Sequence, residues 1–395
     1  MIEVLRPKLF FAGILLGFLA CCFLGYGVSK KARFTHYTRL FNAISPRMQY
    51  YPTTQEFLNT ADHLASKEKI LVLIGGSSVF RGSGQNPEET WTNELQRLLG
   101  NQYTVLNYAV DGGGLTTVGA VLFRALSERY KKIIFVSTAT PGGSGPVDGV
   151  EPYGYFFWEA YYKRLFHPDE IELKRIHNMQ KEQIKTASGL EKQIANYLDS
   201  FLYFRNLWNW VSYRSVFSIW VDPPNTDTAY RKPFGPRRYY KEESHPDLIS
   251  IREAVRKDQA RFDNEWKGYG EMVRYFVSLK ETEPKLDQKL FSEASNSFVE
   301  AFTPSYRSKI VCVVLSLNRK HISMLPKKMQ EAYDLILQRT QKDLSSLGYH
   351  AILVGQDYSP DDFFDGTHLY VTGGNKVAAA VATEVRNIAL ANHYV

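Results

Sequence analysis

Apolar residues are spread along the chain in short runs separated by polar turns, the pattern of a domain in which strands and helices alternate. The first such run, Ile70–Ile74, is aliphatic throughout and meets a cluster of Gly and Ser with no linker between. A continuous apolar run of this length is typical of a strand buried on both faces, and the small residues mark a sharp turn at its carboxyl end. We therefore predict a central strand there.

The same alternation continues along the chain. Four further strands are predicted at residues 103–109, 133–137, 310–315 and 351–354. Helices are predicted at residues 87–99, 115–130, 326–347 and 374–391. Right-handed crossovers arrange these elements into an α/β fold, a three-layer, flavodoxin-like domain around a parallel five-stranded sheet. The carboxyl ends of the strands then share one rim, where ligands bind in open sheets of this kind.

A mostly helical insertion, predicted at about residues 146–304, interrupts the alternation. Within it, residues 201–221 carry an aromatic or aliphatic residue at nearly every third or fourth position, and Arg205 and Arg214 are their only charges before Asp222. This pattern fits a helix that packs the insertion onto the sheet, which we favour, or a helix that lies on a membrane surface. Because the insertion enters and leaves at the carboxyl ends of strands, we expect it to shape the mouth of a site.

The N-terminal segment contains twenty residues, 9–28, without a charge, enough to span a bilayer as one helix. This apolar stretch is longer than that of a cleaved signal peptide, and no small-x-small cleavage site follows it. We predict an uncleaved transmembrane anchor at residues 1–29, a tether and lead-in helix at 30–66, and the α/β domain at 67–395.

Composition and charge narrow the classes of function. The formal charge of +7 over 395 residues permits anionic partners without requiring them, and the sequence has no zinc pattern, basic helix or RNA-binding motif. We therefore expect no nucleic-acid partner. Cys21, Cys22 and Cys312 build neither a disulfide framework nor a metal cluster, so we expect no metal and no cofactor, and a bacterial envelope protein fits this cysteine usage. Neither a phosphate-binding glycine motif nor Gly-x-Ser-x-Gly is present.

Candidate chemistry lies at two ends of the domain. Ser77 and Ser78 follow the first strand, whereas Asp365 precedes His368 by three residues near the C-terminus. On one turn, that spacing lets the carboxylate accept a hydrogen bond from one ring nitrogen. The other nitrogen is then free to take a proton from a serine hydroxyl.

These two segments together resemble the SGNH (GDSL-like) hydrolase family, over about residues 68–145 and 305–395. In that family Gly-Asp-Ser-Leu follows the first strand, a Gly stands four residues after the Ser, and Asp-x-x-His lies near the C-terminus. Here Gly76-Ser77-Ser78-Val79 matches, with Gly82 four residues after Ser78. The resemblance implies Ser78 as nucleophile, His368 as base and Asp365 as its orienting group. Ser77 is the alternative nucleophile, but it would put Arg81 at the glycine position.

The resemblance also implies an oxyanion hole. Its donors are the backbone N–H groups of Ser78 and of Gly112, which matches the glycine of the family's Asn-x-x-x-x-Gly segment beginning at Asn107. The Asn that usually follows the third strand is absent. Thr138 and Thr140 could replace it, although we favour a turn-forming role for both. The loss of one oxyanion donor typically costs on the order of 10²–10³ in rate.

The function implied by the resemblance is a serine-dependent esterase or O-acyltransferase that acts on an envelope polymer or lipid. Because the family's membrane-anchored members act on envelope polymers, we expect the domain on the extracytoplasmic side of the bacterial cytoplasmic membrane. The basic residues after the span slightly outnumber those before it, which favours the opposite orientation, but long domains translocate largely regardless of charge. The implied partners are the lipid bilayer, an acylated polysaccharide or lipid, and a multi-span membrane acyltransferase. The alternative is a non-catalytic polymer-binding or assembly protein on the same scaffold.

Overall fold

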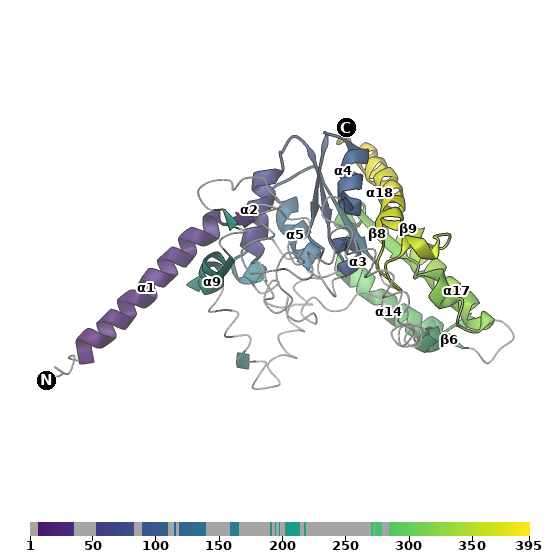
Figure 1. Ribbon diagram of the computed structural model, residues 1–395, viewed down its shortest axis with the longest axis horizontal. Coiled ribbons are helices and arrows are strands. Elements are labelled where there is room, and N and C mark those ends of the chain that lie inside the picture. The colour runs from purple at the N-terminus through teal and green to yellow at the C-terminus, as the bar shows by residue number, and fades with distance from the viewer. Residues whose placement is uncertain are drawn as a thin grey trace.

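The fold is seen in a computed structural model of the chain (Figure 1). The structure describes residues 7–34, 53–82, 89–109, 114–115, 118–139, 159–165, 190–191, 194, 197, 202–213, 217–218, 270–271, 273–278 and 284–395.

Five parallel strands form the central sheet, as the sequence predicts. They are β2 (Ile70–Ile74), β3 (Tyr103–Asn107), β4 (Ile133–Thr138), β8 (Ile310–Leu315) and β9 (His350–Val354). Their order across the sheet is β3-β2-β4-β8-β9, and every neighbouring pair is parallel. The chain therefore leaves β2 toward one edge and returns to β4 on its other side. In open α/β sheets this reversal opens a crevice at the carboxyl ends of the two central strands.

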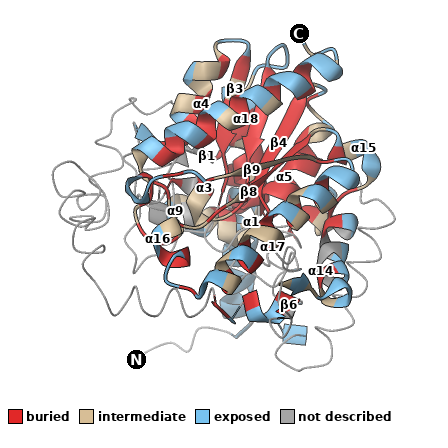
Figure 2. Cartoon of the chain, turned by 90° about the vertical axis from the view of Figure 1, so that its right-hand side faces the viewer, coloured by how far each residue is buried: buried red, intermediate tan, exposed pale blue. Residues whose placement is uncertain are grey.

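Helices cover both faces of the sheet. One face packs against α4 (Trp91–Leu99) and α18 (Val371–Ala391), and the other against α2 (Thr54–Leu64), α5 (Val118–Ser127) and α17 (Lys327–Ser346). Along β2, Val72 and Ile74 face the first layer, whereas Leu71 and Leu73 face the second, and all four are fully buried. Coverage of both faces explains why the strand is apolar at consecutive positions. Figure 2 shows the buried strands between helices whose outer sides are exposed.

Between β4 and β8 the described elements are short strands and helices. They are α9 (Phe204–Tyr213), β5 (Phe217–Ser218), β6 (Val277–Ser278), β7 (Lys285–Leu286), α14 (Gln288–Ala301) and α15 (Pro304–Arg307). The α14 helix begins where the sequence supplies an N-cap, since the carboxylate of Asp287 accepts the N–H groups of Lys289 and Leu290 at 3.0 Å each. Its buried Phe291 and Phe298 join the core on the α17 side of the sheet.

The N-terminal helix α1 (Pro7–Lys31) leaves the domain as a single rod (Figure 1). Within its segment Leu9–Lys31, an 18-residue window has a mean hydropathy of 2.3, and only 6% of that window is buried inside the protein. By length and composition it can cross a membrane. The chain after α1 forms β1 (Arg33–Phe34), which pairs antiparallel with β5.

The aromatic helix α9 contacts α1, which the sequence did not predict, as well as the domain. It lies along α1, with the Phe18 and Phe204 ring centroids 5.4 Å apart and those of Tyr26 and Tyr203 5.2 Å apart. Another side of the helix faces the domain, where Leu207 and Trp210 pack against the core. Its apolar spacing showed that one side would be covered, but that spacing holds no information about which surface covers it. Most of the predicted stretch beyond Tyr213 lies outside the described residues.

Candidate active site

Ser78 stands at the first position of a one-turn helix, α3 (Ser78–Arg81), just beyond the carboxyl end of β2. The turn into it requires glycine: Gly76 has φ +97°, and a Cβ there would lie 2.7 Å from Oγ1 of Thr138. At the other end Gly82, with φ +88°, donates its N–H to the carbonyl of Ser78. Two glycines thus allow the chain to turn sharply on both sides of the serine.

Buried side chains fix this turn from behind. The carbonyl of Phe80 accepts the indole N–H of Trp91 at 2.7 Å and the amide of Asn107 at 2.9 Å. The N–H of Ser77 donates to Oγ1 of Thr138 at 3.3 Å. Trp91 and Asn107 come from α4 and β3, so two further elements of the fold hold α3 in position. Sequence reasoning did not identify Trp91 as part of the site, because nothing local links it to Phe80.

The segment Asp365-Gly366-Thr367-His368 is the tip of a tight hairpin-like turn after β9. Phe363 and Leu369 form an antiparallel bridge at its base, and the N–H of Phe364 donates to the carbonyl of His368 at 2.7 Å. Within the tip, Oδ1 of Asp365 accepts the N–H groups of Thr367 and His368, both at 2.8 Å. The carboxylate therefore organises the backbone that carries the imidazole.

These two turns meet. Oγ of Ser78 lies 2.7 Å from Nε2 of His368, and Nδ1 of the same ring lies 2.8 Å from Oδ2 of Asp365. Ser78 and His368 are 290 residues apart in the sequence. Of the two candidate serines, Ser78 is the one whose hydroxyl contacts the imidazole, whereas Ser77 occupies the N-cap of α3.

The electrostatics of Asp365 favour one tautomer of the His368 ring. The Asp365 side chain is 5% exposed and that of His368 is 24% exposed. Burial opposes ionisation of Asp365, but hydrogen bonds from the His368 ring and from the backbone N–H groups outweigh it and hold the pKa of the carboxyl well below its usual range. An ionised Asp365 accepts a hydrogen bond from Nδ1–H, which leaves the Nε2 lone pair toward the hydroxyl of Ser78.

Asn318 makes two of the contacts that attach the hairpin to the rest of the domain. Asn318, which follows β8, donates its backbone N–H to the carbonyl of Gly366 at 3.0 Å and its side-chain amide to that of Asp365 at 3.3 Å. Asn318 also caps the short helix α16 (Arg319–Ile322) by accepting the N–H of Lys320. In the sequence Asn318 can be identified as a helix cap, but that position does not predict its contact with the hairpin.

At the base of the hairpin, Asp362 in the 3₁₀ turn η2 (Pro360–Asp362) pairs with Lys376 of α18 at 2.5 Å. Hydrogen bonds to Lys376, Thr372 and the Ser359 N–H outweigh the effect of burial and lower the pKa of Asp362. The start of α18 approaches so closely that a Cβ on Gly373 would lie 2.2 Å from the Asp362 carbonyl oxygen.

The predicted oxyanion groups are only partly visible. Gly112 and Thr140 lie outside the described residues. The hydroxyl of Thr138 accepts the Ser77 N–H, in line with the turn-forming role favoured for it. The N–H of Ser78 belongs to the first turn of α3, where backbone N–H groups have no partner within the helix.

Fold and site together define an α/β protein with a Ser–His–Asp constellation at the carboxyl edge of a parallel sheet. No family model, curated protein or solved structure matches the chain. The assignment of function therefore rests on the geometry of the site and on the motif resemblance.

Proposed function

We propose that the protein is a serine-dependent acyl-ester hydrolase or acyltransferase. The observation that carries this proposal is the pair of hydrogen bonds that link Ser78 to His368 and His368 to Asp365. A serine hydroxyl is a weak nucleophile at neutral pH unless a base takes its proton, and the base needs a partner that fixes its tautomer. Ser78, His368 and Asp365 fill these three roles.

The reaction proceeds in two balanced steps. Oγ of Ser78 bonds to the carbonyl carbon of an ester or thioester while its proton passes to Nε2 of His368. The bond to the leaving group breaks, the leaving group takes that proton, and an acyl-Ser78 remains. Water or an acceptor hydroxyl then loses its proton to His368 and attacks the acyl carbon. The bond from that carbon to Oγ of Ser78 breaks, and Oγ takes the proton from His368.

Membership of the SGNH family and its flavodoxin-like fold is part of the proposal. It is supported by the strand order, by the serine directly after the first strand of the sheet, and by the Asp-x-x-His segment after the last. On this basis the N–H groups of Ser78 and Gly112 stabilise the oxyanion of the tetrahedral intermediate. With the usual Asn absent, turnover is expected to be slow or to use another donor.

The proposed setting is the outer side of a bacterial cytoplasmic membrane. The apolar helix α1 supports attachment to a membrane, and the resemblance supports an envelope polymer or lipid as the acylated substrate. If a sugar or polyol hydroxyl is the acceptor, a multi-span membrane acyltransferase is the fitting partner. Protease added to intact spheroplasts should digest the domain; protection until lysis would contradict the outward orientation.

The test is covalent labelling of the full chain by a fluorophosphonate together with turnover of p-nitrophenyl acetate. Ser78→Ala should abolish both, whereas Ser77→Ala should retain most of both, because the Ser77 contact in the turn is made by its backbone N–H. Loss with Ser77→Ala alone would move the nucleophile by one position. If wild-type protein neither labels nor turns over while folded, the non-catalytic polymer-binding alternative replaces the enzyme.

A further inference from the structure

The end of α1 next to the domain carries the features of a membrane–water interface. The ring of Tyr26 stacks edge-on with Tyr203, and the ammonium of Lys30 lies 5.3 Å from the centroid of the Tyr26 ring. Tyr side chains concentrate at headgroup depth, where the ring is apolar and the hydroxyl is wet, and basic residues mark the end of a span. Tyr203 lies one residue before α9 begins, so this aromatic pair places the start of α9 at the same level.

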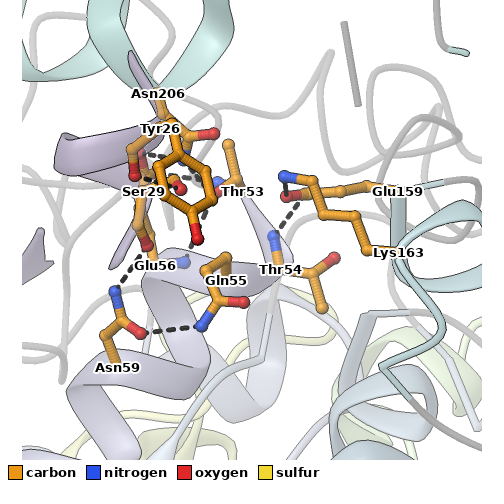
Figure 3. A network of polar contacts seen from close by, with 10 residues as sticks. All are labelled: Tyr26, Ser29, Thr53, Thr54, Gln55, Glu56, Asn59, Glu159, Lys163 and Asn206. Atoms are coloured by element: carbon orange, nitrogen blue, oxygen red, sulfur yellow. Dashed lines mark hydrogen bonds and ion pairs between the residues drawn. The ribbon is translucent and has the colours of Figure 1, made fainter. Parts of the chain in front are cut away.

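Polar contacts fix α9 and α1 relative to each other (Figure 3). Asn59 of α2 donates to the carbonyls of Ser29 and Ala32, both at 2.9 Å, and so satisfies carbonyls at the end of α1. Asn206 of α9 donates to Oγ1 of Thr53 at 2.8 Å and to the carboxylate of Glu56 at 3.0 Å. We call Ser29, Thr53, Glu56, Asn59 and Asn206 the anchor junction. Through α2 it joins both helices to the domain.

The contact between the two helices extends to the depth of the acyl chains. A Cβ on Gly25 would lie 2.6 Å from the carbonyl oxygen of Tyr203, so the backbones are in close contact there. The Phe204 ring reaches Phe18, whose position lies twelve residues before Lys30. At 1.5 Å per residue this is about 18 Å along the helix, against about 15 Å for half of a hydrocarbon core. When α1 spans a bilayer, Phe18 therefore lies in the apolar region, and the Phe204 side chain extends from the start of α9 toward it.

One face of α9 carries further apolar side chains. Phe204, Trp208 and Val211 are spaced i, i+4 and i+7, which places them on one face of the helix. Trp208 is 66% exposed and Val211 is 56% exposed. The opposite side carries the buried Asn206 and also Trp210, whereas Leu207 borders the stripe; Leu207 and Trp210 pack against the core.

We propose that α9 is a second membrane-contact element that lies at the bilayer interface, with Trp208 and Val211 in contact with lipid. This inference rests on the proposed membrane location of α1. Two elements joined by the anchor junction hold the domain in one orientation to the membrane, which a single helix on a flexible tether cannot do. Leu207 and Trp210 face the protein, so the lipid-facing surface is the Phe204–Trp208–Val211 stripe.

The test uses the full chain in phosphatidylcholine–phosphatidylglycerol vesicles, with Cys21 and Cys22 replaced by Ala and the buried Cys312 kept. An environment-sensitive fluorophore is attached to a single new cysteine. Trp208→Cys and Val211→Cys report on α9, Leu15→Cys on α1, and Leu390→Cys, 62% exposed at the far end of α18, is the control. Lipids brominated in the acyl chain and aqueous iodide are the two quenchers.

The labels at 208, 211 and 15 should lose most of their fluorescence intensity to brominated lipid and should not be quenched by iodide. The label at 390 should be quenched by iodide and not by brominated lipid. Quenching of 208 and 211 by iodide, with 15 quenched by lipid, overturns the proposal for α9 but keeps the anchor. Protection of 208 and 211 from both quenchers identifies a protein contact and also overturns it. If 15 itself is open to iodide, the membrane location of α1 fails, and the proposal fails with it.

Discussion

Two regions of the molecule join distant segments through polar side chains, but one network ends inside the protein and the other ends at a partly exposed group. In the anchor junction, Asn206 is 1% exposed and Glu56 is fully buried, and their polar atoms bond to one another and to helix ends. In the active-site rim, formed by Ser78, Asp365 and His368, the chain of bonds begins at a buried carboxylate and ends at a partly exposed hydroxyl.

This difference separates a structural network from a chemical one. A polar network whose bonds end inside the protein stabilises the fold, because a buried group that loses its partner costs free energy. A network that ends at an accessible hydroxyl beside a basic nitrogen leaves that hydroxyl able to react. Substitutions in the rim should therefore affect turnover more than stability, and those in the anchor junction the reverse.

The largest effect is expected for His368→Ala. Without the base, Ser78 is barely nucleophilic, and removal of a catalytic histidine typically costs about 10⁶ in rate. Turnover of p-nitrophenyl acetate and fluorophosphonate labelling should fall below detection. His350 is a second histidine of the same domain, and its Nδ1 lies 3.4 Å from the Glu384 carboxylate. His350→Ala should retain both activities and serves as the control. Equal loss in the two variants would show a general effect on folding.

Asp365→Asn should reduce turnover by about 10⁴, because an amide favours the wrong tautomer of His368. The same carboxyl has a lowered pKa, so the stability it contributes is complete above the ordinary Asp value of about 3.9 and is lost as pH falls toward the folded value. Urea unfolding of wild-type protein should show this acid loss, and the loss should be smaller in Asp365→Asn, which keeps the contribution of Asp362. Asp361→Asn, on the exposed side of η2, is the control; an unchanged acid profile in Asp365→Asn would contradict the assignment.

Gly373→Ala should lower both the free energy of unfolding and the turnover. The added methyl would overlap the Asp362 carbonyl, so the base of the hairpin must shift, at an expected cost of about 1–3 kcal/mol in the free energy of unfolding. Turnover should also fall, since His368 moves relative to Ser78. Asn375→Ala, on the exposed side of the same helix, should change neither. Normal turnover in a destabilised Gly373→Ala protein would show that the hairpin tip is independent of its base.

The smallest effect on turnover is expected for Asn206→Leu. This change removes one buried hydrogen-bond donor from the Glu56 carboxylate and from the Thr53 hydroxyl. The free energy of unfolding should therefore fall by about 1–3 kcal/mol. Urea titration of the full chain in detergent measures it, with Asn387→Leu, an exposed amide on α18 away from the anchor junction, as the control of little effect. Ester turnover should be unchanged. A loss of turnover in folded protein would show that the anchor junction and the rim are coupled.

The sequence revealed those features that depend on local pattern. The run at Ile70–Ile74 and the run at Ile310–Leu315 are strands with the predicted bounds, because a doubly covered strand is apolar at every position. Ser78 and His368 could be paired because both follow strands of one parallel sheet, whose carboxyl ends share an edge.

Contacts between distant segments were not predictable in the same way. Asn318, which contacts the hairpin, and Asn59, which contacts the end of α1, are single polar residues whose partners lie far away in the sequence. The contact of α9 with α1 was not predicted for a related reason, since amphipathic spacing shows that a face is covered but not which element covers it. Such contacts are a property of the assembled fold.

The most direct measurement of the central claim needs no variant. The full wild-type chain is treated with a fluorophosphonate, digested, and the modified residue is located by mass spectrometry. The hydrogen bond from Ser78 to His368 predicts a single adduct on Ser78, which is lost when the protein is first unfolded. An adduct on Ser77 or on another residue, or no adduct in folded protein, would contradict the account.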